Sequence, residues 1–459
     1  MFPEGFIKRI KTQKHIDAGM LLESLRSPSP VSIRINPVKW NQVPADSTPV
    51  PWCSTGYYIS ERPSFTADPL FHAGCYYPQE ASGMFLEEIF RQLFSGKKNL
   101  RVLDLCAAPG SKSTHLSALL ADNGCLIANE VIRARVSVLA ENITRWGIPN
   151  TIVTNNDPAD FSKLKGYFDF IVVDAPCSGE GMFRDPEARK EWSENNAALC
   201  SKRQKRIISE VWPALKENGI LIYSTCTFNP AENEENIKWL IDNTISECVR
   251  IDVSRFPQIT EISYEGITGY GFYPYKSEGD GFFISVVRKK ESSDVVKFRR
   301  NKKAIPVPAK IQKTAEKITG ISAENIFMFN QIVYHTPFSA DEMSFLSSML
   351  KVIRPGTELF RDIGGEIVPE HGLALSVLLN KGIYPVIELN YLQALSYLRK
   401  DNIDVPLPGK GWYTVAYEGC NLGFVKSTGT RLNNLFPVQL RIRMSLEALS
   451  GKQTIKWCM

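Results

Sequence analysis

The stretch Phe168-Asp169-Phe170-Ile171-Val172-Val173-Asp174-Ala175-Pro176-Cys177-Ser178-Gly179-Glu180-Gly181 decides the fold that we expect for this chain. Its first part, up to Val173, is a short apolar run rich in β-branched residues, which is typical of a strand buried in a parallel sheet. An acid, a proline and a thiol follow where this strand ends. Side chains at the carboxyl end of such a strand face the ligand crevice of an open α/β sheet. The stretch therefore predicts an α/β fold with a functional site at this edge.

A second thiol stands at the end of another predicted strand. The strand Ile220-Leu221-Ile222-Tyr223 is followed by Ser224-Thr225-Cys226-Thr227. If the two strands are neighbours in the sheet, Cys177, Cys226 and Asp174 converge on one pocket. Cysteine is most often a small buried apolar residue. Two thiols at two strand ends, one of them three residues after an acid, favour a chemical role instead.

Strands and helices alternate between Leu100 and Arg288. We expect further strands at 102–105, 125–129, 151–154 and 281–287, and helices after Gly110, over 134–146 and over 196–215. Asn229 can cap another helix, with Pro230 at its first position and Glu232 in a capping-box arrangement. The alternation predicts a mostly parallel sheet that is covered by helices. We assign residues 96–290 to this domain.

The remaining regions are predicted from weaker patterns. Residues 1–95 form a small α/β lead-in, with a helix over 6–25, a strand over 31–36 and a helix over 81–94. Residues 291–303 form a basic linker: from 288 to 303 the chain has eight Lys or Arg against Glu291 and Asp294. This run is either a solvated linker or a strap that contacts phosphates. Residues 304–383 form a subdomain with a helix over 340–350, and residues 384–459 contain a helix over 391–400 and a hairpin of strands 411–417 and 422–427.

Composition limits the class of protein. The chain has 459 residues, of which 43% are hydrophobic and 22% charged, as in a soluble globular protein, and its net charge of +5 says little about partners. Ten cysteines without a Cys-x-x-Cys pair, and five histidines at no metal-ligand spacing from a cysteine, predict no metal site. No signal peptide or membrane-length apolar run is visible. We therefore expect a cytoplasmic protein with reduced thiols.

A turn of small residues predicts a site for a nucleoside cofactor. It follows a strand and opens a helix, so its backbone N–H groups can face a ligand. Glu130 ends the next strand 20 residues after Gly110, where an acid can hold a ribose diol, and Asp157 can reach an adenine amino group. The turn is neither Gly-x-Gly-x-x-Gly nor a P-loop, which disfavours NAD and excludes a P-loop nucleotide site. The alternative is a tight turn with two surface acids. The residues of the turn are Cys106, Ala107, Ala108, Pro109, Gly110, Ser111 and Lys112.

Three motifs together resemble the signature of the Nop/Sun family of RNA cytosine-5 methyltransferases. They are Leu103-Asp104-Leu105-Cys106-Ala107-Ala108-Pro109-Gly110-Ser111-Lys112, Asp174-Ala175-Pro176-Cys177-Ser178-Gly179 and Ser224-Thr225-Cys226-Thr227. The resemblance extends to Arg34-Ile35-Asn36-Pro37 and Gln79-Glu80-Ala81-Ser82. The tail, with Tyr397-Leu398-Arg399 and Gly423-Phe424-Val425-Lys426, is similar to the RsmF-type branch, whose members modify small-subunit (16S) ribosomal RNA and end in a PUA-like module.

The resemblance implies a fold and a set of site residues. The fold is a Rossmann-like S-adenosylmethionine-dependent methyltransferase sheet with an N-terminal RNA-binding lead-in and a C-terminal PUA-like α+β region. S-adenosylmethionine would bind over residues 106–112, with its ribose on Glu130 and its base near Asp157. Asp174 would touch both the methyl-donor site and the target cytosine. Cys226 would be the nucleophile and Cys177 the thiol that helps to release the product. Spacing alone leaves open which thiol attacks.

The chemistry of cytosine explains why a thiol and an acid are paired. Thiolate attack at carbon 6 makes carbon 5 electron-rich enough to take a methyl group, and an acid near ring nitrogen 3 and the amino group stabilises the adduct. Two positions differ from the family pattern: Ser111 replaces a frequent glycine, where we expect it to cap the helix, and Phe424 replaces a frequent tryptophan.

We therefore expect methylation of cytosine carbon 5 in 16S ribosomal RNA. The partner would be ribosomal RNA or the small ribosomal subunit, and the protein would be a monomer without a metal or a membrane anchor. One alternative is the same reaction on transfer RNA. The other is a non-catalytic ribosome-assembly factor, against which the intact pair of Cys177 and Cys226 argues.

Overall fold

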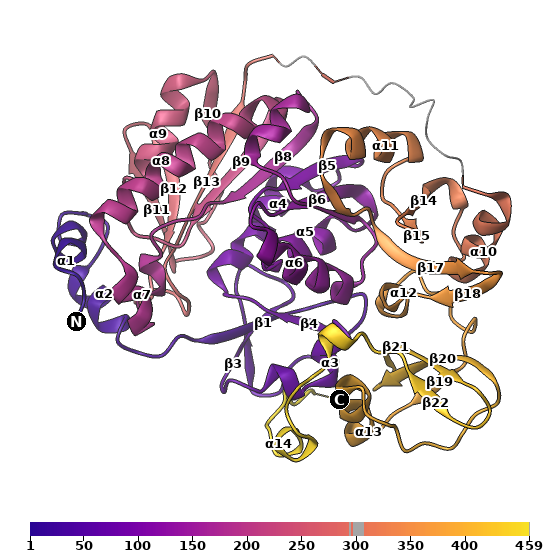
Figure 1. Cartoon of the computed structure of the whole chain (residues 1–459). Coiled ribbons are helices and arrows are strands. Elements are labelled where there is room, and N and C mark those ends of the chain that lie inside the picture. Colours follow the sequence, from indigo (N-terminus) through magenta and orange to yellow (C-terminus); the bar gives the residue numbers. More distant parts are fainter. Residues whose placement is uncertain (293–294, 297–306, 459) are drawn as a thin grey trace.

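A computed structural model describes residues 1–292, 295–296 and 307–458 of the chain (Figure 1). Its largest sheet has ten strands in the order β11-β12-β13-β9-β8-β5-β6-β7-β16, and β10 pairs with β13. The central strands are β5 (Leu100–Asp104), β6 (Gly124–Asn129), β7 (Thr151–Thr154), β8 (Phe168–Asp174) and β9 (Leu215–Thr225), and they pair in parallel. The predicted Rossmann-like sheet is therefore confirmed at its centre.

Both edges of this sheet are antiparallel, which the alternation of strands and helices did not predict. The edge strands are β10 (Ser246–Cys248), β11 (Ile259–Tyr264), β12 (Ile267–Phe272), β13 (Phe282–Lys289) and β16 (Val352–Arg354). Between β11 and β12 only Glu265 and Gly266 intervene, both with positive φ. A two-residue turn can join only antiparallel neighbours.

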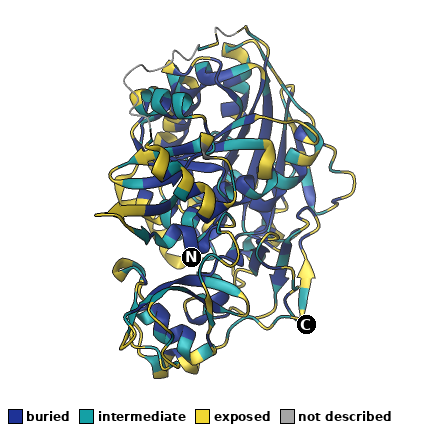
Figure 2. Cartoon of the chain, turned by 90° about the vertical axis from the view of Figure 1, so that its right-hand side faces the viewer, coloured by how far each residue is buried: buried dark blue, intermediate teal, exposed yellow. Residues whose placement is uncertain are grey.

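The central strand β8 is buried on both faces. Ile171 and Val173 pack into one hydrophobic cluster, and Phe170 and Val172 pack into another on the opposite face. This is why the strand is apolar at nearly every position. Figure 2 shows the strands as a buried interior under partly exposed helices. The covering helices are α4 (Leu86–Phe94), α5 (Ser111–Leu120), α6 (Arg133–Trp146), α8 (Glu194–Val211) and α9 (Glu234–Asn243), whereas α7 (Pro186–Glu191) follows the loop after β8 and packs with the N-terminal helices.

The N-terminal segment adds a four-stranded sheet of order β2-β3-β1-β4. Its elements are α1 (Glu4–Ile10), α2 (Ala18–Ser24), β1 (Val31–Ile35), β2 (Ser47–Pro49), β3 (Gly56–Ile59), α3 (Pro69–His72) and β4 (Tyr76–Pro78). The predicted single helix over 6–25 is wrong. Asp17 adopts an extended backbone and its carboxylate accepts the Met20 N–H, so it caps a new helix.

Asn229 Oδ1 accepts the Ala231 N–H at 3.2 Å, as a cap would, but the predicted helix does not begin there. α9 begins only at Glu234, after Asn233. The side chain of Asn229 donates to the Glu232 carboxylate, and that carboxylate accepts from Ser178 on the loop after β8. A tertiary contact has replaced the local capping box.

Two further sheets make up the C-terminal part of the chain. The first, of order β14-β15-β17-β18, comprises β14 (Ile326–Phe329), β15 (Ile332–His335), β17 (Thr357–Ile363) and β18 (Glu366–Pro369), with α10 (Ala309–Thr319), α11 (Ala340–Met349) and α12 (His371–Leu375). The second comprises β19 (Val386–Glu388), β20 (Gly411–Tyr417), β21 (Cys420–Ser427) and β22 (Leu432–Asn434), with α13 (Tyr391–Arg399) and α14 (Leu446–Ser450). The predicted hairpin is confirmed as β20 and β21. Phe424 is buried between them and the neighbouring sheet, with its ring 5.1 Å from that of Tyr384.

Hydrophobic packing crosses the boundaries between the predicted regions. Leu103 of β5 shares a cluster with Leu346 of α11, and Ile33 of β1 shares another with Val425 of β21. Near the C terminus, the Trp457 ring lies 5.4 Å from that of Trp40, and Figure 1 marks this end close to α3. The C-terminal part therefore packs on both the central and the N-terminal sheets.

Most of the predicted basic linker, 291–303, lies outside the described residues. The cations just before it are part of the sheet. The buried ammonium of Lys289 in β13 donates to the carbonyls of Trp212 and Leu215 at 3.1 and 3.0 Å. Arg288 and Lys290 both pair with Glu247 of β10. These three cations hold the sheet edge together and do not form a free strap. In the part of the chain that the structure describes, no helix has the length and apolar character of a membrane span.

Candidate active site

Two thiols lie side by side at the carboxyl edge of the parallel strands. β8 and β9 are neighbours, with Asp174 opposite Ser224 in register. Cys177 lies on the loop after β8, and Cys226 directly follows β9. Their sulfur atoms are 3.0 Å apart, and the Cys226 N–H donates to Cys177 Sγ at 3.3 Å. The sheet topology alone brings these residues together from positions far apart in the sequence.

The carboxylate of Asp174 stands beside the thiols with two partners. Its Oδ1 accepts from Ser224 Oγ at 2.7 Å, and its Oδ2 accepts from Lys112 Nζ at 2.7 Å. Burial opposes the charge on Lys112, but the attraction of Asp174 raises the pKa of the ammonium overall. Lys112, predicted as part of the cofactor turn, thus directs its charge towards the acid and the thiols.

The turn between β5 and α5 is shaped for a close approach of the backbone. Gly110 has a φ of +116°, a conformation that favours glycine. Arg135 and Asn142 of α6 donate to the carbonyls of Ala108 and Pro109 at 2.5 and 2.8 Å and so fix the turn from outside. Ser111 does not cap α5 as expected, because Gly110 occupies the cap position and Ser111 is the first helical residue.

The two predicted acids lie along the same edge. Glu130, after β6, is buried, its Oε1 accepts the Ile132 N–H at 2.8 Å, and its Oε2 lies 3.6 Å from Arg135. Asp157, after β7, is more exposed; its Oδ1 accepts from the Ala159 N–H at 3.1 Å and from Arg206 at 2.7 Å. Asp157 is therefore a turn cap and an ion-pair partner as well as a candidate ligand.

A cavity of about 570 Å³ joins these groups into one site. The predicted residues that line it are Cys106, Ala108, Glu130, Asp157, Asp174, Cys177 and Cys226. The remaining predicted residues of the turn, Ala107, Pro109, Gly110, Ser111 and Lys112, are not part of its lining. The predicted acids and thiols therefore line the cavity, whereas most of the small-residue turn lies behind its surface.

The cavity has a basic wall that the sequence analysis missed. Arg203 and Arg206 of α8 line it, together with Arg135 and the exposed Met182. The run Lys202-Arg203-Gln204-Lys205-Arg206 was a visible signal for the α8 part of this wall. Cations at the mouth of a cavity attract an anionic substrate.

Two groups in and behind the site have pKa values well above their usual ones. The hydrogen bond between the sulfurs, and then burial, raise the pKa of the Cys177 thiol well above its usual value. Behind the turn, burial raises the pKa of Asp104 to about 7, although Ser113 Oγ donates to it at 2.6 Å. The Cys177 thiol therefore keeps its proton more readily than an ordinary cysteine does.

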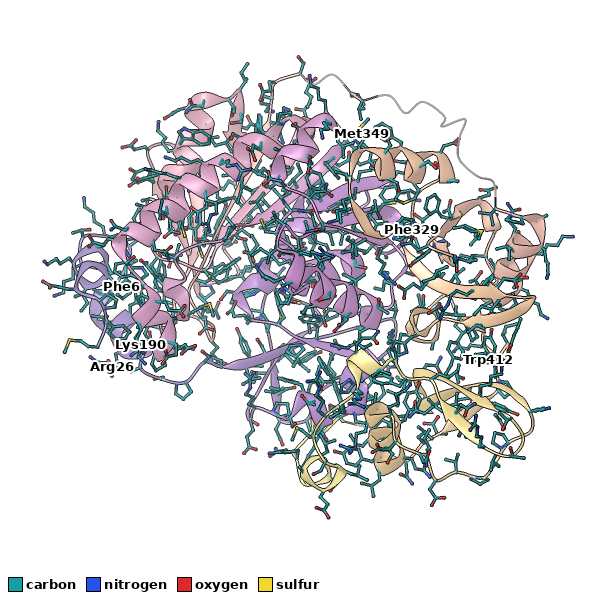
Figure 3. The ribbon with its side chains drawn as sticks, in the orientation of Figure 1. Phe6, Arg26, Lys190, Phe329, Met349 and Trp412 are labelled. Atoms are coloured by element: carbon teal, nitrogen blue, oxygen red, sulfur yellow. The ribbon has the colours of Figure 1, made fainter. Side chains whose placement is uncertain are left out.

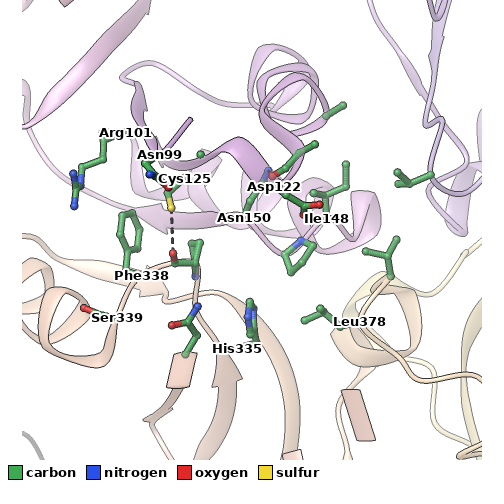
Figure 4. A pocket seen from close by; sticks show the side chains of 18 of the residues that line it. Asn99, Arg101, Asp122, Cys125, Ile148, Asn150, His335, Phe338, Ser339 and Leu378 are labelled. Atoms are coloured by element: carbon green, nitrogen blue, oxygen red, sulfur yellow. Dashed lines mark hydrogen bonds between the residues drawn. The ribbon is translucent and has the colours of Figure 1, made fainter. Parts of the chain in front are cut away.

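A larger cavity, of about 760 Å³, lies at the opposite edge of the sheet (Figure 4). Asn99 and Asn150, which precede β5 and β7, face Phe338 and His335 across it, and Cys125 Sγ donates to the Pro337 carbonyl. Its lining, among the described residues, contains none of the predicted site residues. Ligands of open α/β sheets bind at the other edge, where the strands end.

One cluster of metal-ligating residue types forms away from the thiols. Cys53, Glu87 and His115 place ligand atoms within 4.8 Å of one another. The sequence spacing hid them because they come from three separate segments. His115 Nε2 and Cys53 Sγ both contact Glu87 Oε2 at 3.1 Å, and the positive charge of buried Arg34 acts on His115. A second cation is disfavoured there, so we interpret the cluster as a hydrogen-bonded network of the core.

Three family models match the chain. They are 16S rRNA methyltransferase RsmB/F over residues 92–288, the N-terminal domain of 16S rRNA methyltransferase RsmF over residues 2–81, and the methyltransferase RsmF PUA domain over residues 384–442. Among solved structures, a methyltransferase homolog protein from Pyrococcus horikoshii is similar at 28% identity and a TM-score of 0.54, covering 63% of this chain and 95% of that one. NSun6 from the same organism, with SFG, has a TM-score of 0.53 at 21% identity, over 63% of this chain and 99% of that one, and supports the fold alone.

Curated relatives match over nearly the whole length. Ribosomal RNA small subunit methyltransferase F of Klebsiella pneumoniae is 30% identical over 475 residues, which covers 96% of each chain. The protein of that name from Shewanella woodyi is 33% identical over 425 residues, 85% of this chain and 84% of that one. The expected family is therefore confirmed, and this chain belongs to the family of ribosomal RNA small subunit methyltransferase F.

Proposed function

We propose that this protein methylates carbon 5 of a cytosine in 16S ribosomal RNA, with S-adenosylmethionine as the methyl donor and a thiolate as the nucleophile. The observation that carries this proposal is the pair of sulfurs, 3.0 Å apart, in one cavity with Asp174 and Glu130. The names of the relatives favour small-subunit RNA over transfer RNA. Two intact thiols in a cavity argue against a purely structural role in ribosome assembly.

The residues present fit the methyl donor. The buried carboxylate of Glu130 suits a ribose diol, and the turn around Gly110 lets a ligand approach the backbone. We assign Asp157 to the edge of the adenine base of the methyl donor. Its Oδ1 already accepts hydrogen bonds from the Ala159 N–H and from Arg206. When bound, S-adenosylmethionine supplies an electrophilic methyl group.

In the proposed first step, Cys226 attacks as a thiolate. Its Sγ would bond to carbon 6, and the π electron pair of the carbon 5–carbon 6 double bond would move to carbon 5. Carbon 5 would then bond to the methyl group, the bond between that methyl group and the donor sulfur would break, and S-adenosylhomocysteine would leave. Asp174 would accept a hydrogen bond from the exocyclic amino group of the target cytosine. The adjacent Lys112 ammonium would offset the negative charge that develops on the ring. The target base must first be flipped into the cavity.

In the proposed second step, Cys177 completes the reaction. Its pKa is raised by its hydrogen bond to Cys226, so Cys177 holds a proton while Cys226 attacks. Once Cys226 is bonded to carbon 6, that hydrogen bond no longer retains the proton, and Cys177 releases it to water. Cys177 then takes the proton from carbon 5, and the freed electron pair restores the double bond and expels Cys226.

The proposal includes the setting of the reaction. Ribosomal RNA or the small subunit would be the partner of a monomeric cytoplasmic enzyme. The basic wall of α8, with Arg203 and Arg206, would receive the phosphates that flank the target base. Phe424 packs in the interior, so the RNA contacts of the PUA-like region would come from other residues.

Replacing each thiol by alanine tests the roles of the pair. Cys226→Ala should be inactive and form no adduct, because the nucleophile is gone. Cys177→Ala should attack and then stall, and it should accumulate a protein–RNA complex that survives denaturing gel electrophoresis. Cys248→Ala, on the edge strand β10, is the matched control and should keep its activity. Exchanged results would make Cys177 the nucleophile, and activity in both site variants without an adduct would refute covalent catalysis.

Bisulfite sequencing of RNA from cells that lack the protein tests the substrate. We expect a 5-methylcytosine to disappear from 16S ribosomal RNA while transfer RNA is unchanged, and purified protein should restore it. Loss confined to transfer RNA would support a transfer RNA methyltransferase. Unchanged methylation together with slow subunit assembly would support a non-catalytic ribosome-assembly factor.

A further inference from the structure

We propose that Glu232 is a positioning residue that clamps the two thiol-bearing loops together and so sets the distance between Cys177 and Cys226. The inference rests on the proposed function, because the spacing of the sulfurs matters only if both take part in the reaction. Glu232 lies in the segment between β9 and α9, and its side chain is fully buried.

The Glu232 carboxylate accepts four hydrogen bonds. Its Oε2 accepts from the Ser178 backbone N–H at 2.9 Å and from Gln204 Nε2 at 3.1 Å. Its Oε1 accepts from Ser178 Oγ and, at 3.2 Å, from Asn229 Nδ2. An ionised carboxylate is an acceptor at every lone pair, so it can satisfy four donors at once, which an amide cannot.

These donors come from three separate parts of the chain. Ser178 immediately follows Cys177 on the loop after β8. Asn229 belongs with Cys226 to the segment after β9, and Ser178 Oγ also contacts Thr227 Oγ1 there at 3.0 Å. Gln204 of α8 completes the bridge, because its Nε2 donates to the Pro176 carbonyl at 3.0 Å as well as to Glu232. One side chain therefore joins both thiol loops and the helix that supports them.

The Glu232 carboxylate holds the two thiol loops together for an electrostatic reason. Burial raises the pKa of Glu232, whereas the hydrogen bonds from Ser178 stabilise its charge. If the Cys177 loop moved away, a buried carboxylate would lose two of its four donors, which is costly in a low-dielectric interior. The loops are thus held where both sulfurs face the cavity.

The clamp matters for catalysis because it sets the positions of the two reacting sulfurs. A displacement of about 1 Å at a reacting group can slow a reaction about a hundredfold. Cys226 must reach carbon 6 while Cys177 reaches the proton on carbon 5 of the same base. Glu232 is not part of the cavity lining, so it acts through the two loops.

Hydrogen–deuterium exchange tests the clamp without RNA or cofactor. Glu232→Gln places an N–H₂ group among donors, so we expect on the order of tenfold faster exchange in the peptides around Ser178 and Thr227. The matched control is Glu234→Gln, two residues away and also buried, where one carboxylate oxygen has no hydrogen-bond partner in the described part of the protein. This control should leave both peptides unchanged. Unchanged exchange in Glu232→Gln would overturn the clamp, whatever reaction the protein performs.

Single-turnover kinetics test its effect on the proposed reaction. In Glu232→Gln we expect the rate constant of methylation to fall about a hundredfold, with unchanged affinity for S-adenosylmethionine and RNA. Should this variant fail to fold, Ser178→Ala removes the hydroxyl shared by Glu232 and Thr227 and should slow both methylation and adduct formation about tenfold. A full rate in a variant whose loops exchange faster would refute the clamp and leave the roles of the thiols intact. Inactivity of the wild-type protein on RNA would refute the proposed function, and the exchange result would still decide the clamp.

Discussion

At the scale of single residues, burial holds the histidines of this protein neutral. The pKa of each of the five is lowered, and burial is the main cause in each case. His335 on β15 is the simplest, because burial alone lowers its pKa to about 4, and its Nδ1 finds no hydrogen-bond partner among the described residues. A histidine whose pKa is lower in the folded than in the unfolded state stabilises the fold above about pH 6.5 and loses that contribution as the pH falls towards 4.

We therefore predict that the histidines make the protein less stable well above about pH 4, the usual pKa of a carboxylate. Between pH 7 and pH 5, His335 alone should lower the free energy of unfolding by about 2 kcal/mol. His335→Gln, which cannot take up a proton, should reduce the loss by that amount. Urea unfolding of both proteins at the two pH values measures the difference, and equal losses would show that His335 is protonated in the folded state.

At the scale of elements, the first helix supports the loops that carry the thiols. Phe6 of α1 is fully buried, with its ring 4.9 Å from Phe183 on the loop after β8 and 6.4 Å from Phe228 after β9. Arg9 of the same helix pairs with the buried Glu180, and Figure 3 labels Phe6 on this helix at the side of the molecule. The lead-in does not line the cavity, but it packs against the two loops that carry the thiols, in addition to any role in binding RNA.

Phe6→Ala should weaken the packing of α1 against these loops. Removing a buried phenylalanine ring costs about 3–5 kcal/mol, so we expect a lower melting temperature and slower methylation, because both thiol loops lose a neighbour. Lys8→Ala on the same helix, where the side chain is exposed, should change the stability by less than about 0.5 kcal/mol. Thermal melting and a methylation assay of the two variants give the comparison, and a normal rate in Phe6→Ala would separate α1 from the site.

At the scale of the whole molecule, the chain folds back on itself. β16 extends the central sheet beside β7, and the Cys458 N–H donates to the Val43 carbonyl at 2.8 Å. The clusters that contain Leu103 and Ile33 each include apolar side chains from beyond residue 330. The C-terminal part is therefore packed as part of the fold and is not a freely tethered module.

We predict that the chain cannot be divided without loss. A fragment of residues 1–296 would expose the apolar surfaces that α11 and the 391–457 region cover, and it should aggregate when expressed alone. Coexpressed with residues 307–459, it should co-purify and bind S-adenosylmethionine, because the interface is intact. Size-exclusion chromatography and calorimetry measure both outcomes. A monodisperse first fragment with the full-length melting temperature would show that the shared clusters contribute little.

The sequence by itself determined the centre of the fold and the residue types that gather in the candidate site. The apolar run before Asp174 indicated a strand buried in a parallel sheet, and the small residues around Gly110 indicated a turn that opens a helix, because these signals are local. Only the tertiary structure decided what depends on residues far apart in the chain: the separation of Cys177 and Cys226, the antiparallel edges of the sheet, and the return of Trp457 to Trp40. Glu232 shows the difference most clearly, since its spacing predicts a local capping box, yet four donors from three segments bind its carboxylate between the thiol loops. A local pattern states which hydrogen bonds a side chain can make, but the fold determines which partners are near enough to make them.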